Sequence, residues 1–259
     1  MDDPEPMRPE GLRLRKAAVV SIFASLISLP CLGGAVLGQE STSRAGIQSF
    51  GSSSSYSPDS SHILIGESQH RRIWTLGAEY THRLHQGPLF RLDYEGSLIP
   101  VYEETDPTVV GTKFTFAGQD FITQQAPVRV VSVAHGPVGA AETGLTTSVP
   151  LYALFGRQNT YAAALSPLGV RVSALPHWRL QPGFAVDLGF VLSARDIPVD
   201  HTSQFNYLIA FGPGLQFFGD NHLSWRVEYL YRHVSNAGQG NQNPGVDQGV
   251  VRVTVSRYR

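Results

Sequence analysis

The segment from Leu223 to Ser235 reads LSWRVEYLYRHVS, and its polarity alternates with a period of two. Because successive side chains of a β-strand point to opposite faces, this pattern predicts a strand with one apolar and one polar face. The polar face carries charges of both signs, such as Arg226 and Glu228, and the apolar face is rich in aromatic rings. The apolar face ends in two residues of catalytic type, His233 and Ser235.

The same alternation recurs along most of the chain and predicts an all-β fold. After residue 38 no segment approaches the run of roughly 18 apolar residues that indicates a membrane-spanning helix. We expect eight strands, at residues 45–54, 71–84, 88–102, 159–174, 178–194, 203–218, 222–235 and 247–258.

Alternating strands suit either a water-soluble sandwich, with its apolar faces inside, or a membrane barrel, with its apolar face outside. Only 16% of the residues are charged, against roughly 25% in ordinary soluble domains, and the apolar faces are long and aromatic. The strands also reach the roughly 9–11 residues that cross a bilayer at a tilt. We therefore predict an eight-stranded antiparallel transmembrane β-barrel. Its lumen would be filled by charges that neutralise one another, among them Arg91, Asp93, Glu95, Glu79, Arg226, Glu228 and Arg232.

The connections alternate in length, as in outer-membrane barrels with short periplasmic turns and longer extracellular loops. Tight turns are expected at 85–87, near Pro176 and at 219–221, and longer loops at 55–70, 103–158 and 236–246, with 195–202 intermediate. Residues 103–158 are too many for a plain loop. We expect this segment to be a long extracellular loop that extends the barrel wall or contains a further hairpin.

Residues 1–38 are predicted to be a signal peptide, because a basic cluster at 13–16 precedes an apolar stretch at 17–37 and small residues before Gln39. The alternative is a retained transmembrane helix, which Pro30 and the glycine pair 33–34 disfavour. The mature chain, 39–259, would lack cysteine, because Cys31 is the single one. The net charge of −1 gives no electrostatic footprint for a nucleic-acid partner.

His233 and Ser235 share a face of the predicted strand, at a separation of roughly 6.6–6.8 Å. They can form a base and nucleophile pair at the extracellular end of the strand, near the outer leaflet. After the loop, Asp247 lies on the same parity as the outward-facing Val251, so its carboxylate can orient the imidazole. A triad outside the barrel suits a lipid substrate. Alternatively, the two residues are polar interfacial side chains without a catalytic role.

The stretch from Tyr231 to Gly238 (YRHVSNAG), with Asn243-Pro-Gly and Asp247, resembles the active-site region of the PagL-type lipid A 3-O-deacylases, also called acyloxyacyl hydrolases. That family consists of eight-stranded outer-membrane barrels with a His-x-Ser-Asn motif and a carboxylate twelve residues after the serine, the spacing found here. The resemblance covers most of 70–259 in strand layout and is specific in 231–247.

This resemblance implies that Ser235 is the nucleophile, His233 the base and Asp247 the orienting acid. Asn236 and Asn243 match conserved asparagines and are candidates for stabilising the oxyanion. The resemblance implies neither a metal nor a cofactor. This chain departs from the family pattern at the acid, since the family has glutamate where this chain has Asp247. If Asp247 lay directly opposite Ser235, it would have to reach His233 diagonally across roughly 7–8 Å, unless the register shifted toward His233.

The predicted function is an outer-membrane serine esterase that removes the ester-linked acyl chain at position 3 of lipid A, with lipopolysaccharide as substrate. Two alternatives remain open at this point. One is a non-catalytic small barrel that anchors or adheres through residues 103–158. The other is an outer-membrane phospholipase.

Overall fold

The structure, a computed structural model, describes residues 47–142 and 148–259, so the predicted signal peptide lies outside the described residues. No described segment forms a helix long and apolar enough to cross a membrane. The regular structure consists of strands whose bounds are β1 Gln48–Ser57, β2 Arg72–Gln86, β3 Phe90–Phe116, β4 Gln119–Arg129, β5 Gly139–Glu142, β6 Ser148–Ala174, β7 Leu180–Ile197, β8 Ser203–Phe218, β9 Leu223–Ser235 and β10 Val246–Tyr258.

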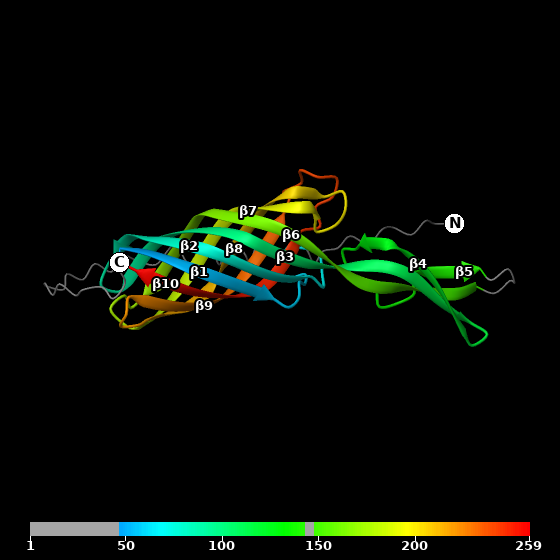
Figure 1. The fold of residues 1–259 in the computed structure, drawn as a ribbon, viewed down its shortest axis with the longest axis horizontal. Helices are drawn as coiled ribbons and strands as arrows, with labels where there is room; N and C mark the ends of the chain where they lie inside the picture. The colour runs from blue at the N-terminus through cyan, green and yellow to red at the C-terminus, as the bar shows by residue number, and fades with distance from the viewer. Residues whose placement is uncertain (1–46, 143–147) are drawn as a thin grey trace, which may run out of the picture. The chain divides into compact units, whose positions relative to one another are not determined.

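All neighbouring strands pair antiparallel, and the sheet closes on itself (Figure 1). The pairing runs β3-β2-β1-β10-β9-β8-β7-β6, and β6 returns to β3, so these strands form a ring. One end of the ring carries the short turns 87–89, 175–179 and 219–222, and we call it the turn end. The other end carries the loops 58–71, 198–202 and 236–245, and we call it the loop end.

Two strands, β4 and β5, were not among the eight predicted, and both lie within residues 103–158. Here β3 continues to Phe116 and turns through residues 117–118 into β4, while β5 pairs with the first part of β6. The sequence did not predict the part of β3 after residue 102, because a register shift between Ile99 and Tyr102 exchanges the two faces of the strand. Before the shift odd residues such as Glu95 are buried, and after it even residues such as Glu104 are buried.

The faces of the ring are inverted relative to a soluble protein, as the alternation predicted. On β9 the outward residues Trp225, Val227 and Tyr229 are exposed, whereas Arg226 and Glu228 are buried. Inside, Arg226 contacts Glu79 (2.5 Å), Glu95 (2.7 Å) and Glu228 (3.2 Å). Such pairing is required because an unpaired charge in a dry interior is costly. The network also includes the buried residues Arg171, Asp187 and Arg252, whereas Arg232 donates to Ser55 Oγ (3.3 Å).

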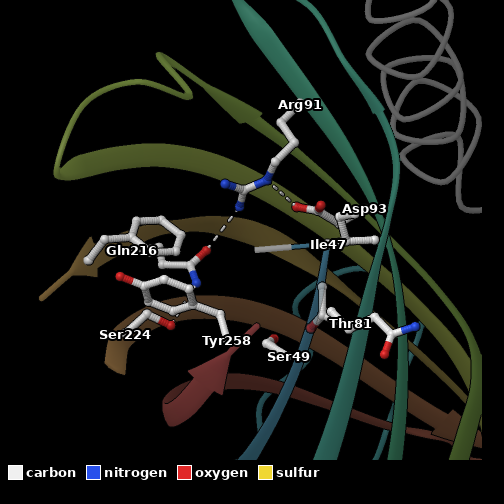
Figure 2. A pocket seen from close by; sticks show the side chains of 10 residues that line it. Ile47, Ser49, Thr81, Arg91, Asp93, Gln216, Ser224 and Tyr258 are labelled. Atoms are coloured by element: carbon white, nitrogen blue, oxygen red, sulfur yellow. Dashed lines mark hydrogen bonds and ion pairs between the residues drawn. The ribbon is translucent and has the colours of Figure 1, made fainter. Parts of the chain in front are cut away.

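The interior of the ring is filled differently at its two ends. Near the turn end a cavity of about 20 Å³, the size of one water molecule, lies among polar side chains and the apolar surfaces of Ile47, Phe218 and Tyr258 (Figure 2). There Arg91 donates to Asp93 (2.6 Å) and to Gln216 (3.3 Å). Toward the loop end an apolar cluster fills the ring, formed by Ile73, Ile99, Tyr102, Ala164, Val191, Ile197, Leu208, Ala210, Leu230, Val234 and Val250. The cluster supports the wall beneath the candidate site.

Candidate active site

The register of β9 and β10 places His233 directly opposite Asp247 at the loop end. The two side chains share the outward face, and His233 Nδ1 lies 2.7 Å from Asp247 Oδ1. Asp247 therefore does not have to reach His233 diagonally, as it would if it lay opposite Ser235. The loop 236–245 sets this register, because β10 begins at Val246, opposite Val234. An aspartate is long enough for this contact, since directly opposed Cβ atoms lie only about 4.5–5.5 Å apart.

Four donors surround the Asp247 carboxylate. Oδ1 accepts from the Tyr231 hydroxyl (2.7 Å) as well as from the imidazole, and Oδ2 accepts from the peptide N–H groups of Leu64 (2.7 Å) and Ile65 (2.8 Å). The side chain is fully buried. An acid that only accepts, and is met by four donors, is held in its ionised form. Asp247 therefore has the outward parity that the sequence predicted, but it is not exposed to lipid, because the loop 58–71 covers it.

The carboxylate also fixes the proton on the imidazole. With Nδ1 donating to Asp247, Nε2 of His233 keeps its lone pair and can accept a proton from a nucleophile. The His233 side chain is about one-tenth exposed. Its ring packs against Gly245, where an added Cβ would lie 2.8 Å from Cε1. Gly245 has a φ of +55°, so this close approach and the backbone conformation both favour glycine.

Ser235 lies two residues after His233 on β9 and is half-buried. Across the sheet it faces Tyr207 of β8, and His233 faces Ile209. Within the described residues, the Ser235 hydroxyl makes no hydrogen bond, so Ser235 is next to the imidazole by strand periodicity rather than by contact. Nucleophile and base pairs are often this loose without substrate.

The two asparagines have different surroundings in the loop 236–245. Asn236 is buried; its Nδ2 donates to the carbonyl of Gln242 (2.8 Å), and its Oδ1 accepts from Gly238 N (2.9 Å). The amide nitrogen and the amide oxygen of Asn236 are therefore both used in hydrogen bonds within the loop. Asn243 is exposed and uses Oδ1 to accept from Asn236 N (3.2 Å). Its Nδ2 makes no hydrogen bond in the described part of the chain, so of the two side chains that of Asn243 has an amide group left to donate.

Tyr231 and the segment 64–66 also belong to this site, although the sequence did not predict them as parts of it. Tyr231 had a usable signal, since it lies two residues before His233 on the same face. The segment 64–66 had none, because its contacts with Asp247 join residues more than 180 positions apart. At Gly66 an added Cβ would lie 2.7 Å from Asp247 Oδ1. Among the residues that the structure describes, no group of His, Cys, Asp and Glu is arranged to hold a metal ion.

Comparison with known proteins supports the family suggested by the motif. The sequence model of the family "Lipid A 3-O-deacylase (PagL)" matches residues 142–256, somewhat less than half of the chain. The match includes β6 to β10 and with them His233, Ser235 and Asp247. The similarity to this family is therefore confirmed. No curated protein matches the sequence.

Two solved structures are similar to the chain. One is described as the crystal structure of the outer membrane enzyme PagL, with 12% identity, a TM-score of 0.45, and coverage of 81% of this chain and 99% of that one. The other is the crystal structure of Neisserial surface protein A (NspA), with 8% identity, a TM-score of 0.39, and coverage of 83% and 99%.

Proposed function

We propose that this protein is a serine esterase of the bacterial outer membrane that removes the acyl chain at position 3 of lipid A. The observation that carries the proposal is the buried His233–Asp247 pair, which lies on the outward face of the sheet with Ser235 beside it. The pair falls within the segment that matches the lipid A 3-O-deacylase family.

In the proposed reaction Ser235 Oγ attacks the ester carbonyl while Nε2 of His233 takes the hydroxyl proton. The bond between the acyl carbon and the sugar oxygen breaks, and His233 returns the proton to that oxygen. Water then hydrolyses the acyl-serine ester by the same route and releases the fatty acid. Asp247 stabilises the imidazolium that forms in each step. Asn243 Nδ2 is the candidate donor to the oxyanion.

The position of the site supports a lipid substrate. The outward residues of β9 below the site, Trp225, Val227 and Tyr229, are all exposed, as are Val251 and Val253 on β10. Large exposed apolar surfaces of this kind are rare on soluble monomers and are required on the lipid face of a membrane barrel. A substrate embedded in the outer leaflet would meet Ser235 from this side, without leaving the membrane.

Mass spectrometry of lipid A from cells that express the protein tests the proposal. We expect the wild type to produce lipid A that has lost one ester-linked acyl chain, and Ser235→Ala to produce none. The matched control is Ser132→Ala, which removes the hydroxyl of an exposed serine outside the site and should leave the product unchanged. An unaltered lipid A profile with the wild type would favour a non-catalytic barrel. Fatty acid released from phospholipid alone would favour a phospholipase.

A further inference from the structure

The loop between β1 and β2 is docked on the start of β10 through its backbone. Ser61 N donates to the carbonyl of Asp247 (3.2 Å), Glu67 N to that of Pro244 (2.5 Å) and Ser68 N to that of Gly245 (3.0 Å). Two isolated bridges, from Ser60 to Gln248 and from Ser68 to Val246, fix the ends of the same segment. Residues 61–67, which we call the acid loop, are thereby held against the outer side of the wall.

The tip of the acid loop is built around the carboxylate. The peptide N–H groups of Leu64 and Ile65 both donate to Oδ2 of Asp247. His62 Nδ1 lies 2.6 Å from the carbonyl of Gly66 and so closes the loop on itself. Because an added Cβ at Gly66 would lie 2.6 Å from Asp247 N, only glycine lets the loop come this close. These contacts make the loop a support for the acid rather than a connection that happens to pass it.

The side chains at the tip point away from the protein. Ile63, Leu64 and Ile65 are 43%, 40% and 62% exposed, three consecutive apolar residues on the outward side of the ring. Loops that face water are usually polar, since exposed apolar surface is unfavourable there. The acid loop lies over the outward face of β9 and β10, where Tyr229 and Val251 are also exposed. Its tip continues the surface that we assign to the lipid.

We infer that the acid loop is a positioning element that contacts lipid: its apolar tip enters the hydrocarbon of the outer leaflet while its peptide N–H groups hold Asp247 toward His233. The inference rests on the proposed function. In this scheme the position of the Asp247 carboxylate depends on the membrane. Leu64 and Ile65 contact lipid with their side chains and hold the carboxylate with their peptide N–H groups. Leu64 and Ile65 are positioning residues in this scheme, since they act through Asp247.

Gly66→Ala tests the positioning role, with Gly136→Ala as matched control because nothing lies within 4 Å of an added Cβ there. Both variants and the wild type are reconstituted in phospholipid vesicles, and the folded fraction is measured by heat modifiability on gels. Two substrates are compared, lipid A in the same vesicles and a short-chain p-nitrophenyl ester in water. We expect Gly66→Ala to lower kcat about tenfold to a hundredfold on both, since a misplacement of about 1 Å has effects of that order. KM should change little. A folded Gly66→Ala protein with the kcat of Gly136→Ala would overturn the positioning role.

Ile63→Ser tests the lipid contact, with Ile122→Ser on the exposed strand β4 as matched control. We expect Ile63→Ser to raise KM for lipid A severalfold with less than a twofold effect on the water-soluble ester, and Ile63→Leu to restore the KM. Equal losses on both substrates, or none on lipid A, would refute the lipid contact. Ser235→Ala in the same assays separates the two proposals. If it leaves turnover intact, the proposed function fails, whereas normal loop variants beside an inactive Ser235→Ala refute the inference alone.

Discussion

Replacing Asp247 with asparagine should remove most of the turnover while the ring remains closed. The amide keeps one acceptor oxygen, but its NH₂ group can only donate. Whichever way the amide turns, the NH₂ group faces either two peptide N–H groups or the Tyr231 and His233 donors. In the second orientation the His233 Nδ1 proton loses its acceptor, and the imidazole is free to adopt the tautomer that cannot take a proton on Nε2.

The magnitude follows from the burial of the acid. Loss of the charged member of a buried triad lowers kcat by up to roughly 10⁴-fold. Because Asp247 is fully buried and meets four donors, we expect kcat to fall about 10³- to 10⁴-fold, which corresponds to about 4–5.5 kcal/mol in activation free energy. The pairing of β9 with β10 should be unaffected by the substitution, since it is made by backbone hydrogen bonds and not by the Asp247 side chain.

The assay is lipid A deacylation by mass spectrometry at matched amounts of heat-modifiable barrel. Asp220→Asn is the control, because Asp220 lies at the turn end and pairs with Arg179 at the surface. It makes the same chemical change far from the site and should leave turnover unchanged. An Asp247→Asn protein within about threefold of the wild type would refute the triad assignment.

Three further substitutions follow from the same geometry. Asp247→Glu should lower kcat rather than raise it, because the carboxylate already lies 2.7 Å from His233 and an extra methylene would press on Gly66. Overpacking of this kind costs about 1–3 kcal/mol of folding stability. A variant more active than the wild type would show that the reach of the aspartate side chain limits the wild type. Tyr231→Phe removes one of four donors to the carboxylate and should reduce kcat about tenfold with little change in folded yield; an unchanged kcat would mean that the other donors suffice. Val227→Arg places a charge on the outward face and should destabilise the barrel by about 2–4 kcal/mol in urea unfolding from vesicles, whereas a neutral effect would place Val227 away from hydrocarbon.

The strands were predictable because their signal is local. Strands such as β8 and β9 alternate over ten or more residues, and their predicted positions differ from the observed bounds by at most one residue. The prediction ended too early in β3 and began too late in β6. In β3 the shift between Ile99 and Tyr102 exchanges inward and outward residues, so a single parity followed along the chain breaks there. Bulges of this kind depend on the partner strand, which a local pattern does not contain.

The candidate site was predictable where it depends on one strand and not where it depends on several. Strand periodicity places His233 and Ser235 on one face whatever the rest of the chain does. The position of Asp247 opposite His233 depends on how the loop 236–245 closes, and the twelve-residue spacing alone did not fix it. The cover over the acid comes from residues 61–67, and no pattern within the motif refers to them.

The closure of the ring has a consequence for when the chemistry begins. The base and the nucleophile belong to the penultimate strand, the acid to the last, and the acid loop follows the first strand. The pairing of β9 with β10 brings the base to the acid, whereas the acid loop reaches Asp247 from the other end of the chain, where β1 pairs with β10. A chain still in transit, with its two ends apart, lacks two of the four donors to Asp247. If Ser235 is the nucleophile as proposed, the support of its acid is complete only when the two ends of the chain have met.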